Sequence, residues 1–384
     1  MKLIHLADLH IGKRVNEFSM LEDQQYVLGE ILRLIDEERP DGIVMAGDIY
    51  DKSVPAGEAV EIFDQFLTDL VARRKGIYLV SGNHDSAERL NFGSRIMQQA
   101  GVYIAGTFKG ELLPIAEADE YGPVNFYLLP FIKPAMVSAY YPEVEILSYQ
   151  DAVQAVIDKA SINPHERNIL VAHQFITSGS QSPERSESET IAVGGLDNID
   201  AAVFDAFDYV ALGHLHGPQS IGRATVRYAG SPLKYSFSEA HHHKSVTVVE
   251  LNAKNNLQIR MLELQPRHSM REIKGPIAQL LEVAATTPEE NDDYIRAILT
   301  DQEEIYDAIG QLRNVYPNIM RIDFENSRTR LDAPSKTAAS GDVARKSPLE
   351  LFDEFYLNQN NCPLSDGQKN IVEDTFAKIG GVPL

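Results

Sequence analysis

Residues 42–51, GIVMAGDIYD, form a short apolar run that ends in a glycine and two carboxylates, Asp48 and Asp51. Four more runs have the same form, with nearly continuous apolar character closed by a polar residue. They are LIHLAD (3–8), IYLVSGN (77–83), NILVAHQ (168–174) and YVALGH (209–214). Short apolar runs of this kind are typical of strands that are covered on both faces of a sheet. The sequence therefore predicts a core of fully buried strands.

The segments between these runs have a helical pattern. Apolar residues recur at three- and four-residue spacing in 19–38, 56–74 and 86–100, which predicts three helices. Buried strands that alternate with amphipathic helices over residues 1–262 indicate an α/β domain built in layers. Later runs at 226–232 and 245–251 predict further strands, which we expect in a second sheet.

A change of pattern after residue 262 predicts smaller parts. Residues 266–325 predict a second, small α/β domain that could bind DNA. Residues 326–348 are rich in Ser, Ala, Arg and Lys and predict a flexible linker. Residues 349–384 predict a tail of two helices with an apolar face. The elements expected in the small domain are helix 277–285, strand 294–299, helix 303–315 and strand 319–324.

The composition excludes several classes of protein. The chain has 384 residues, of which 43% are hydrophobic, so a disordered or fibrous protein is excluded. Cys362, the single cysteine, cannot form a disulfide within the chain, and the first residues lack the pattern of a secretory signal. No apolar run approaches the roughly 20 residues needed to cross a bilayer. We therefore expect a cytoplasmic protein that does not enter membranes.

The net charge of −21 argues against a broad surface for nucleic acid. Proteins that bind duplex DNA draw much of their affinity from Lys and Arg side chains that replace counterions on phosphates. A polyanion would have to be held locally, by a metal site or by a basic partner.

Polar side chains follow the predicted strands at the points where each strand ends. Such ends expose side chains to a crevice in an open α/β sheet. Carboxylate and amide oxygens mixed with imidazoles suit Mn, Fe or Zn better than the all-oxygen sites that Ca or Mg prefer. The residues concerned are Asp8, His10, Asp48, Asn83, His84, His173, His214 and His216.

The order of these residues resembles the calcineurin-like metallophosphoesterase superfamily. The motifs that carry the resemblance are D-x-H (8–10), G-D-x-x-D (47–51), G-N-H-D (82–85), His173 and G-H-x-H (213–216). Longer segments narrow it to the SbcD family of nuclease subunits, over nearly the whole chain. These are LADLHIGKRVNEFSMLEDQ (6–24), GDIYDKSVPAGEAV (47–60), LLPFIKP (128–134) and YAGSPLKYSFSEA (228–240). The resemblance implies a layered αββα sandwich with a small α/β capping domain and a C-terminal helical tail.

A two-metal site is implied by the same resemblance. One ion would be held by Asp8, His10, Asp48 and His216, and the second by Asp48, Asn83, His173 and His214, so that Asp48 bridges the pair. The family's preference implies two Mn²⁺ ions, with Mg, Fe or Zn as alternatives. Two divalent ions with only two carboxylate ligands leave about +2 of charge. This would create a local positive site in an acidic chain.

His84 follows a proposed ligand directly, so we expect its side chain to leave the ligand cluster and face the substrate. There it could act as a general acid or a phosphate clamp, with Asp85 orienting its ring. Asp51 is equally well explained as a site residue or as a carboxylate at a helix entry. Lys13, Arg14 and Asn16 could contact DNA phosphates, although exposed loop charges are more often solvated. Residues proposed to line the crevice by resemblance are Tyr228, Ser231 and Lys234.

The other histidines have simpler explanations. The three histidines at 241–243 lack spaced carboxylates, so we interpret them as part of an ordinary loop. We expect His5 to be a core residue, and His165 and His268 to lie on the surface.

The activity implied by the resemblance is that of a 3′-to-5′ double-strand exonuclease and a single-strand or hairpin endonuclease in DNA repair, recombination and replication. The implied assembly is a dimer of nuclease subunits with two SbcC-type coiled-coil ATPases, which the tail helix 349–360 would contact. Two alternatives stay open: another metallophosphoesterase, acting on phosphoproteins or small nucleotides, and a non-catalytic subunit that tethers DNA ends.

Overall fold

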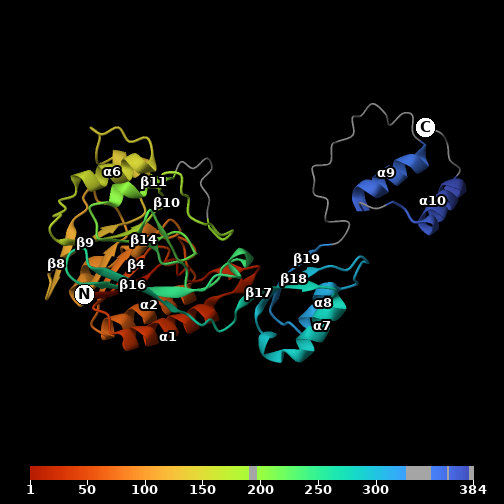
Figure 1. Ribbon diagram of the computed structural model, residues 1–384, viewed down its shortest axis with the longest axis horizontal. Coiled ribbons are helices and arrows are strands. Elements are labelled where there is room, and N and C mark those ends of the chain that lie inside the picture. The colour runs from red at the N-terminus through yellow and green to blue at the C-terminus, as the bar shows by residue number, and fades with distance from the viewer. Residues whose placement is uncertain (190–196, 326–346, 361–362, 380–384) are drawn as a thin grey trace. The chain divides into compact units, whose positions relative to one another are not determined.

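The structure is a computed structural model that describes residues 1–189, 197–325, 347–360 and 363–379 (Figure 1). The predicted linker at 326–348 lies almost entirely outside the described residues. The chain divides into two compact units, Met1–Met270 and Arg271–Leu384.

Two six-stranded sheets form the centre of the first unit. The first sheet has the order β16-β15-β1-β4-β5-β6. Strands β1, β4, β5 and β6 run parallel, whereas β15 pairs antiparallel with both β1 and β16. Its strands are β1 (Lys2–Leu6), β4 (Gly42–Ala46), β5 (Gly76–Val80), β6 (Val102–Ala105), β15 (Ser245–Leu251) and β16 (Leu257–Glu263).

The second sheet has the order β13-β14-β12-β9-β8-β7. Its four central strands are parallel, and β13 and β7 are antiparallel edges. Its strands are β7 (Pro114–Asp119), β8 (Gly122–Leu129), β9 (Arg167–His173), β12 (Tyr209–Gly213), β13 (Gln219–Ile221) and β14 (Arg223–Tyr228). Two short pairs complete the unit: β2 (Arg14–Val15) with β3 (Phe18–Ser19), and β10 (Ile176–Thr177) with β11 (Ile199–Asp200).

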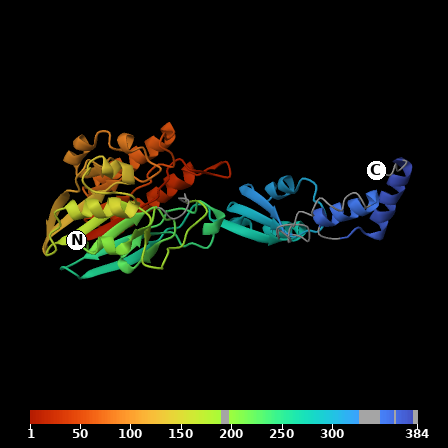
Figure 2. The same ribbon diagram turned by 90° about the horizontal axis from the view of Figure 1, so that it is seen from above.

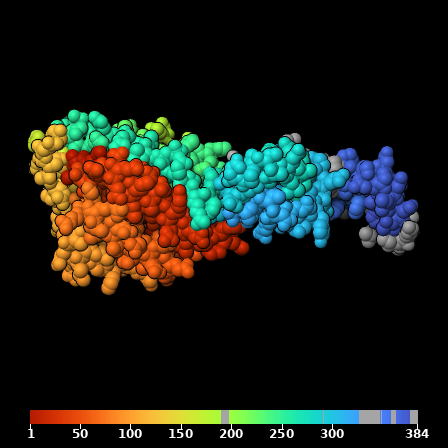
Figure 3. Space-filling view, turned by 90° about the horizontal axis from the view of Figure 1, so that it is seen from below, coloured from red at the N-terminus to blue at the C-terminus, as the bar shows by residue number. Residues whose placement is uncertain are grey.

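The main core lies between the two sheets. Apolar side chains of both sheets meet there, including Val44 and Val80 from the first and Phe126, Val171 and Tyr209 from the second. A second core joins the outer face of the second sheet to α6 and the 3₁₀ helix η3. Figure 1 shows α1 and α2 on one side of the sheets and α6 on the other, and Figure 3 shows α1 and α2, in red and orange, covering much of one face. The layered αββα sandwich is therefore confirmed.

Two of the three helices predicted for this unit, at 19–38 and 56–74, are confirmed, and the unit has other helices that were not predicted. The bounds of these helices are α1 (Leu21–Glu38), α2 (Gly57–Ala72), α3 (Ala87–Leu90), α4 (Ser94–Met97), η1 (Gln98–Ala100), α5 (Pro134–Ser138), α6 (Tyr149–Lys159), η3 (Ala201–Phe204) and η4 (Phe237–Glu239). The helix predicted at 86–100 is wrong as one element, because it divides at Gly93, whose φ of 73° is left-handed. The expectation that residues 245–251 join the second sheet is also wrong, because β15 pairs with β1 in the first.

The described part of the second unit begins with a three-stranded sheet of order β17-β18-β19 and its own core. Its elements are β17 (Met270–Gly275), α7 (Ile277–Thr286), η5 (Pro288–Glu290), β18 (Tyr294–Leu299), α8 (Ala308–Arg313) and β19 (Ile319–Phe324). Helix α8 is shorter than the predicted 303–315, because Asp307 caps its first turn by accepting a hydrogen bond from the Gly310 amide at 3.2 Å.

Two helices form the tail, α9 (Pro348–Asn360) and α10 (Asp366–Ile379), and they lie next to each other (Figure 2). The Phe352 ring packs edge-on against Phe376 at 6.3 Å between centroids. Within the described residues, no helix combines the length and apolar character that a bilayer crossing requires.

Candidate metal centre

The loops that carry the predicted ligands meet where the parallel strands of both sheets end. Asp8 follows β1, Asp48 follows β4 and Asn83 follows β5, all in the first sheet. His173 is the last residue of β9, and His214 directly follows β12. Because the two sheets face each other, these five loop positions converge in one small region, as expected for strand ends in an α/β fold.

The backbone in these loops adopts an uncommon conformation. Asp8, His10, Asp48 and His214 have positive φ values of 54°, 44°, 50° and 103°. Positive φ costs free energy in residues other than glycine, and such positions concentrate at functional sites where the surrounding structure enforces them. Four of the predicted ligands therefore lie at strained backbone positions.

One group of ligand atoms comes from Asp8, His10 and His216, all buried, with the atoms within 4.8 Å of one another. The Nε2 atoms of His10 and His216 face each other at 3.1 Å. The Oδ2 atom of Asp8 is buried and has no hydrogen-bond partner among the described residues. A buried carboxylate oxygen without a partner is costly, and a cation among these three atoms would satisfy it.

A second group lies beside the first and includes the amide of Asn83. Its Oδ1 atom lies 2.9 Å from His173 Nε2 and 3.0 Å from His214 Nδ1. Asp48 lies between the groups, because its Oδ2 is 3.6 Å from His10 Nε2 and 3.3 Å from His173 Nε2. The seven predicted ligands are thus brought together, with Asp48 in the position that a bridging ligand needs.

The electrostatics of the cluster favour a bound cation. Burial raises the pKa of Asp8 well above its ordinary value, and the charge of Asp48 adds to this effect. Burial lowers the pKa of His10 and His216, and it lowers that of His214 to about 3, so these imidazoles are neutral as metal ligands must be. Burial also disfavours the charged form of His173, but Asp48 outweighs it and raises that pKa to about 9. Asp48 therefore stabilises a positive charge in the cluster even without a metal ion, in the form of the extra proton on His173.

These residues fit two divalent cations. The donor set offers two carboxylates, one amide oxygen and four imidazoles, which suits Mn, Fe or Zn. Asp8 and Asp48 are also held by backbone amides, since Asp8 Oδ1 accepts from His214 N at 2.8 Å and Asp48 Oδ1 accepts from His84 N at 2.9 Å. The second carboxylate oxygen of each residue is left facing the cluster.

Gly82 is required for the position of Asp48, and Gly82→Ala tests this. A Cβ at residue 82 would lie 2.1 Å from Asp48 Oδ1 and 2.4 Å from Asp48 N, so the loop must shift. We expect a loss of ~1–3 kcal/mol in the free energy of unfolding, as for overpacked sites, together with weaker Mn²⁺ binding. Denaturant unfolding and calorimetric titration with MnCl₂ measure the two effects.

Gly29→Ala is the matched control, because Gly29 lies in α1 and nothing lies within 4 Å of an added Cβ. We expect this variant to gain ~0.5–1 kcal/mol from helix propensity and to bind Mn²⁺ normally. Unchanged metal binding in Gly82→Ala would contradict the steric requirement.

His84 lies closer to the ligands than predicted. Its ring packs edge-on against His10 at 4.8 Å between centroids, and a ligand atom of His84 falls within 4.8 Å of ligand atoms of His10 and Asp48. Its Nδ1 donates to the backbone carbonyl of Asp51 at 2.9 Å, which holds the ring. The expectation that this side chain leaves the cluster is therefore wrong in geometry.

Asp85 holds the surrounding loops. Its carboxylate accepts from the amides of Gly82, Tyr50 and Ile49 at 2.9, 2.9 and 3.2 Å. It thereby fixes the backbone that follows Asp48 and the residue that precedes Asn83. The ring of His84, which we expected Asp85 to orient, is held by the carbonyl of Asp51. The side chain of Asp51 pairs with Lys13 at 2.7 Å and lies 3.6 Å from His10 Nδ1. Asp51 is therefore next to the site.

The residues predicted to bind substrate have different positions. Arg14 and Asn16 are exposed in the β2–β3 hairpin, where Arg14 donates to the Glu17 carbonyl. Tyr228 is completely buried, and its hydroxyl accepts from Ile176 N at 2.7 Å. Ser231 is buried and donates to the Leu233 carbonyl at 2.7 Å. Lys234 donates to the carbonyl of Ala240 at 2.5 Å.

These contacts change the interpretation of the segment 228–234. The side chains of Tyr228, Ser231 and Lys234 are used inside the fold, so we do not include them in the proposed substrate site. The two hairpin residues, Arg14 and Asn16, stay candidates for contact with a phosphate.

Two further sets of residues near the ligands were not selected from the sequence. Gln24 donates to the His10 carbonyl at 2.7 Å and accepts from Gly12 N at 2.9 Å, which anchors the first ligand loop to α1. Glu239 and Lys244 form a buried ion pair behind His216. Glu239 belongs to the quoted segment 228–240, but a single carboxylate in a loop gives no signal of its own.

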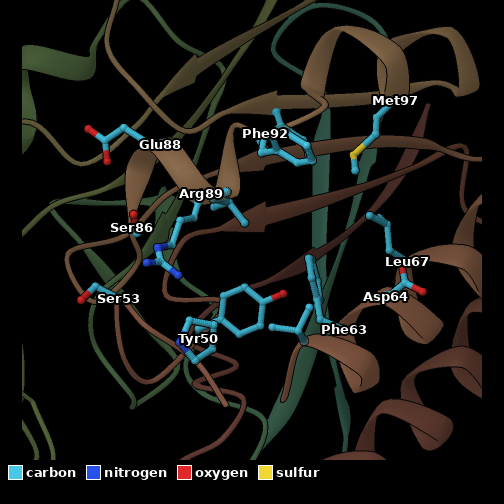
Figure 4. A pocket seen from close by; sticks show the side chains of 14 residues that line it. Tyr50, Ser53, Phe63, Asp64, Leu67, Ser86, Glu88, Arg89, Phe92 and Met97 are labelled. Atoms are coloured by element: carbon cyan, nitrogen blue, oxygen red, sulfur yellow. The ribbon is translucent and has the colours of Figure 1, made fainter. Parts of the chain in front are cut away.

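A separate hollow of about 620 Å³ lies between α2 and the segment 86–97. Figure 4 shows the rings of Tyr50, Phe63 and Phe92 around it. None of the seven predicted ligands is among its lining residues. The metal-ligand cluster therefore lies outside this hollow, and its side chains are more buried.

Comparisons with known families agree with the fold. Residues 1–218 match the family model described as calcineurin-like phosphoesterase. Residues 266–360 match a second model, SbcD_C, described as type 5 capsule protein repressor C-terminal domain. A curated relative from Staphylococcus epidermidis, named as the SbcD subunit of the nuclease SbcCD, is 32% identical over 382 residues, which is 99% of each chain.

Two solved structures are also similar to this chain. A dimetal phosphatase from Danio rerio shares 12% identity with a TM-score of 0.43, covering 69% of this chain and 96% of that one. The protein TT1561 of Thermus thermophilus shares 12% identity with a TM-score of 0.38, covering 68% and 98%.

Proposed function

The chain belongs to the calcineurin-like phosphoesterase family and, within it, to the SbcD family of nuclease subunits, and we propose that it is a Mn²⁺-dependent two-metal DNA nuclease. A metal-dependent phosphodiesterase activity follows from that membership. The proposal adds the metal, the number of ions, and the activities: 3′-to-5′ cleavage of duplex ends and endonucleolytic cleavage of single strands and hairpins.

The observation that carries the proposal is the position of Asp48. Its Oδ2 lies within 3.6 Å of a ligand nitrogen from each half of the cluster, His10 Nε2 and His173 Nε2. A carboxylate in this position could be shared by two bound ions, as in two-metal phosphodiesterases, with Asp8, His10 and His216 on one side and Asn83, His173 and His214 on the other. When bound, the ions would attract the negatively charged phosphodiester, and they would lower the pKa of a water molecule so that it can lose a proton and act as the nucleophile.

The protein's own residues would place the substrate and move a proton. His84 lies beside the ligands His10 and Asp48, and its Nδ1 is held by the Asp51 carbonyl. With a proton on Nε2, it can donate to the leaving oxygen or to a phosphoryl oxygen. Lys13 pairs with Asp51 at 2.7 Å, and the Asp51 carboxylate lies 3.6 Å from His10 Nδ1, so this ion pair borders the cluster on the His10 side.

The paired charges of the second unit support a proposal about how DNA is held. In the described part of the second unit, Arg271 pairs with Asp293 at 2.9 Å, Arg296 with Glu272 at 2.6 Å, and Arg321 with Asp323 at 3.0 Å. Cations that are already paired contribute little to phosphate binding. We therefore propose that the metal centre and a partner supply most of the affinity for DNA, although the prediction gave this unit a DNA-binding role.

The proposed partner is a coiled-coil ATPase. The curated relative is named as one subunit of SbcCD, and this chain has no G-x-x-x-x-G-K-[ST] nucleotide loop of its own. The tail presents exposed apolar side chains, with Phe355, Leu357 and Ile371 exposed by 59, 46 and 68%. We propose that two copies of this chain assemble with two ATPase subunits, and that α9 and α10 make the contact.

The decisive experiment is cleavage of a linear duplex and a hairpin in MnCl₂, with and without EDTA and with and without the partner ATPase. We expect Mn²⁺-dependent cleavage of both DNA substrates and two equivalents of bound Mn²⁺. Activity on a phosphopeptide or a cyclic nucleotide without DNA cleavage would favour another phosphoesterase. Full metal occupancy without cleavage of any substrate would favour a tethering subunit.

The tail contact gives a separate prediction. Phe355→Glu and Ile371→Glu each place a charge in an exposed apolar position, and we expect the affinity for the ATPase to fall at least ~30-fold, as for interface hot spots. Surface plasmon resonance measures this affinity. Hydrolysis of bis-p-nitrophenyl phosphate should be unchanged, because the tail lies outside the ligand loops.

Asn370→Glu is the control, since it adds the same charge at an exposed polar position next to Ile371. We expect wild-type affinity for this variant. Equal losses in Asn370→Glu and Ile371→Glu would show that charge, and not apolar contact, decides the binding.

A further inference from the structure

A buried ion pair lies behind the ligand His216. Lys244 Nζ donates to Glu239 Oε2 at 2.6 Å, to the His216 carbonyl at 2.8 Å and to Ser231 Oγ at 2.8 Å. All three protons of the ammonium group thus have acceptors, and both charged side chains are almost completely buried. A buried pair is stable only when its remaining hydrogen-bonding capacity is used, as it is here.

Ser188 connects this pair to the imidazole of His216. Its hydroxyl donates to Glu239 Oε1 at 2.5 Å and lies 2.7 Å from His216 Nδ1. Because the hydroxyl proton is given to the carboxylate, the serine oxygen is an acceptor for the proton on Nδ1. The relay therefore selects the tautomer with the proton on Nδ1 and a free lone pair on Nε2, which is the atom that faces His10 at 3.1 Å.

The backbone of His216 is fixed by the same region. Its amide donates to Glu189 Oε1 at 2.7 Å, and its carbonyl accepts from Lys244 and from the Ser231 amide at 3.2 Å. Gly230, with φ of 78°, allows this close approach, since a Cβ there would lie 2.8 Å from the His216 carbonyl oxygen. Both the position and the ring orientation of His216 are thus determined by residues outside the ligand set.

We propose that Ser188, Glu239 and Lys244 are positioning residues that fix His216 as a ligand of one of the two metal ions. This inference rests on the proposed function. The ion pair is neutral as a whole, so it orients the imidazole without cancelling the positive charge of the bound ions. A lone carboxylate in its place would remove part of that charge.

The relay makes an asymmetric prediction about the two ions. Only His216 is held by it, so loss of the Ser188 hydroxyl should weaken one Mn²⁺ site and spare the other. Groups that hydrogen-bond a ligand imidazole typically change metal affinity by ~10–100-fold. The test is calorimetric titration of the metal-free full chain with MnCl₂, with electron paramagnetic resonance after each equivalent to separate single from coupled ions.

Ser188→Thr and Ser188→Val are the matched variants, since they have nearly the same shape and differ in the hydroxyl. We expect Ser188→Val to lose ~10–100-fold affinity at one site, Ser188→Thr to keep both affinities, and the melting temperature of the metal-free protein to stay the same in both. The paired replacement Glu239→Gln with Lys244→Met removes the two charges together and should weaken the same site. Ser138→Ala removes a hydroxyl that only bonds the Pro134 carbonyl and should change nothing.

If Ser188→Val and the paired variant both bind the two Mn²⁺ ions with the wild-type affinities, the inference is overturned. Equal weakening of both sites with a lower melting temperature would also overturn it, because that result indicates a general structural role. A wild-type chain that binds fewer than two Mn²⁺ ions would contradict the proposed function itself, so the two failures are distinguishable.

Discussion

Asp48→Asn is expected to reduce bound Mn²⁺ from two ions to at most one and to lower DNA cleavage at least ~10³-fold. The substitution keeps the shape of the side chain, including an oxygen that can accept from the His84 amide. It removes the negative charge and the second carboxylate oxygen, which lies between His10 and His173. Metal analysis by mass spectrometry and single-turnover cleavage of a hairpin measure the two effects.

Asp41→Asn is the control for this variant. Asp41 lies just before β4, whereas Asp48 lies just after this strand. Like Asp48, Asp41 accepts a hydrogen bond from one backbone amide, that of Lys2 at 2.7 Å. We expect two bound Mn²⁺ ions and full cleavage in Asp41→Asn. Two tightly bound ions in Asp48→Asn would mean that another residue bridges them, and the proposed arrangement of the site would be wrong.

The buried strands and the polar residues at their ends were accessible from the sequence for one physical reason, whereas the αββα arrangement and the two-metal assignment came from resemblance. A strand buried on both faces is a continuous apolar run, and the first polar residue after it marks the loop where a side chain reaches the crevice. Asp8, Asp48 and His214 are such residues, and their positive φ values show that the loops turn directly at them. Short-range patterns therefore located residues that are far apart in the chain.

Contacts between distant segments were not accessible in the same way. The sequence gives no sign that β15 pairs with β1, because an apolar strand fits either sheet until its neighbours are known. Tyr228 and Ser231 were assigned to the crevice by resemblance, whereas their hydroxyls bond inside the fold to Ile176 and Leu233. Which way a side chain points depends on tertiary packing, which local patterns do not contain.

The predicted helix at 86–100 shows a related limit. Apolar spacing continued through Gly93, but the chain turns there with a φ of 73° and divides the segment into short helices. A glycine within a helical pattern weakens the helix by about 1 kcal/mol relative to alanine. That small local cost left either outcome open, and the surrounding structure decided between them.

His84→Ala is expected to separate catalysis from metal binding. If His84 donates a proton or clamps a phosphoryl oxygen, its loss should lower the cleavage rate by ~10²–10⁴-fold while two Mn²⁺ ions stay bound. Because the structure places its ligand atom within 4.8 Å of those of His10 and Asp48, the alternative is that His84 is itself a ligand. Calorimetric titration with MnCl₂ beside single-turnover cleavage distinguishes the two roles.

Two controls make the His84 result specific. His165→Ala removes an exposed histidine and should leave both binding and cleavage unchanged. A DNA substrate with a good leaving group at the scissile bond needs little help from a general acid, so His84→Ala should cleave it nearly as fast as the wild type if proton donation is the role. A rate that stays equally low with this substrate would indicate a phosphate clamp, because phosphoryl oxygens are contacted whatever group departs. Loss of one Mn²⁺ ion would contradict both roles and make His84 a ligand.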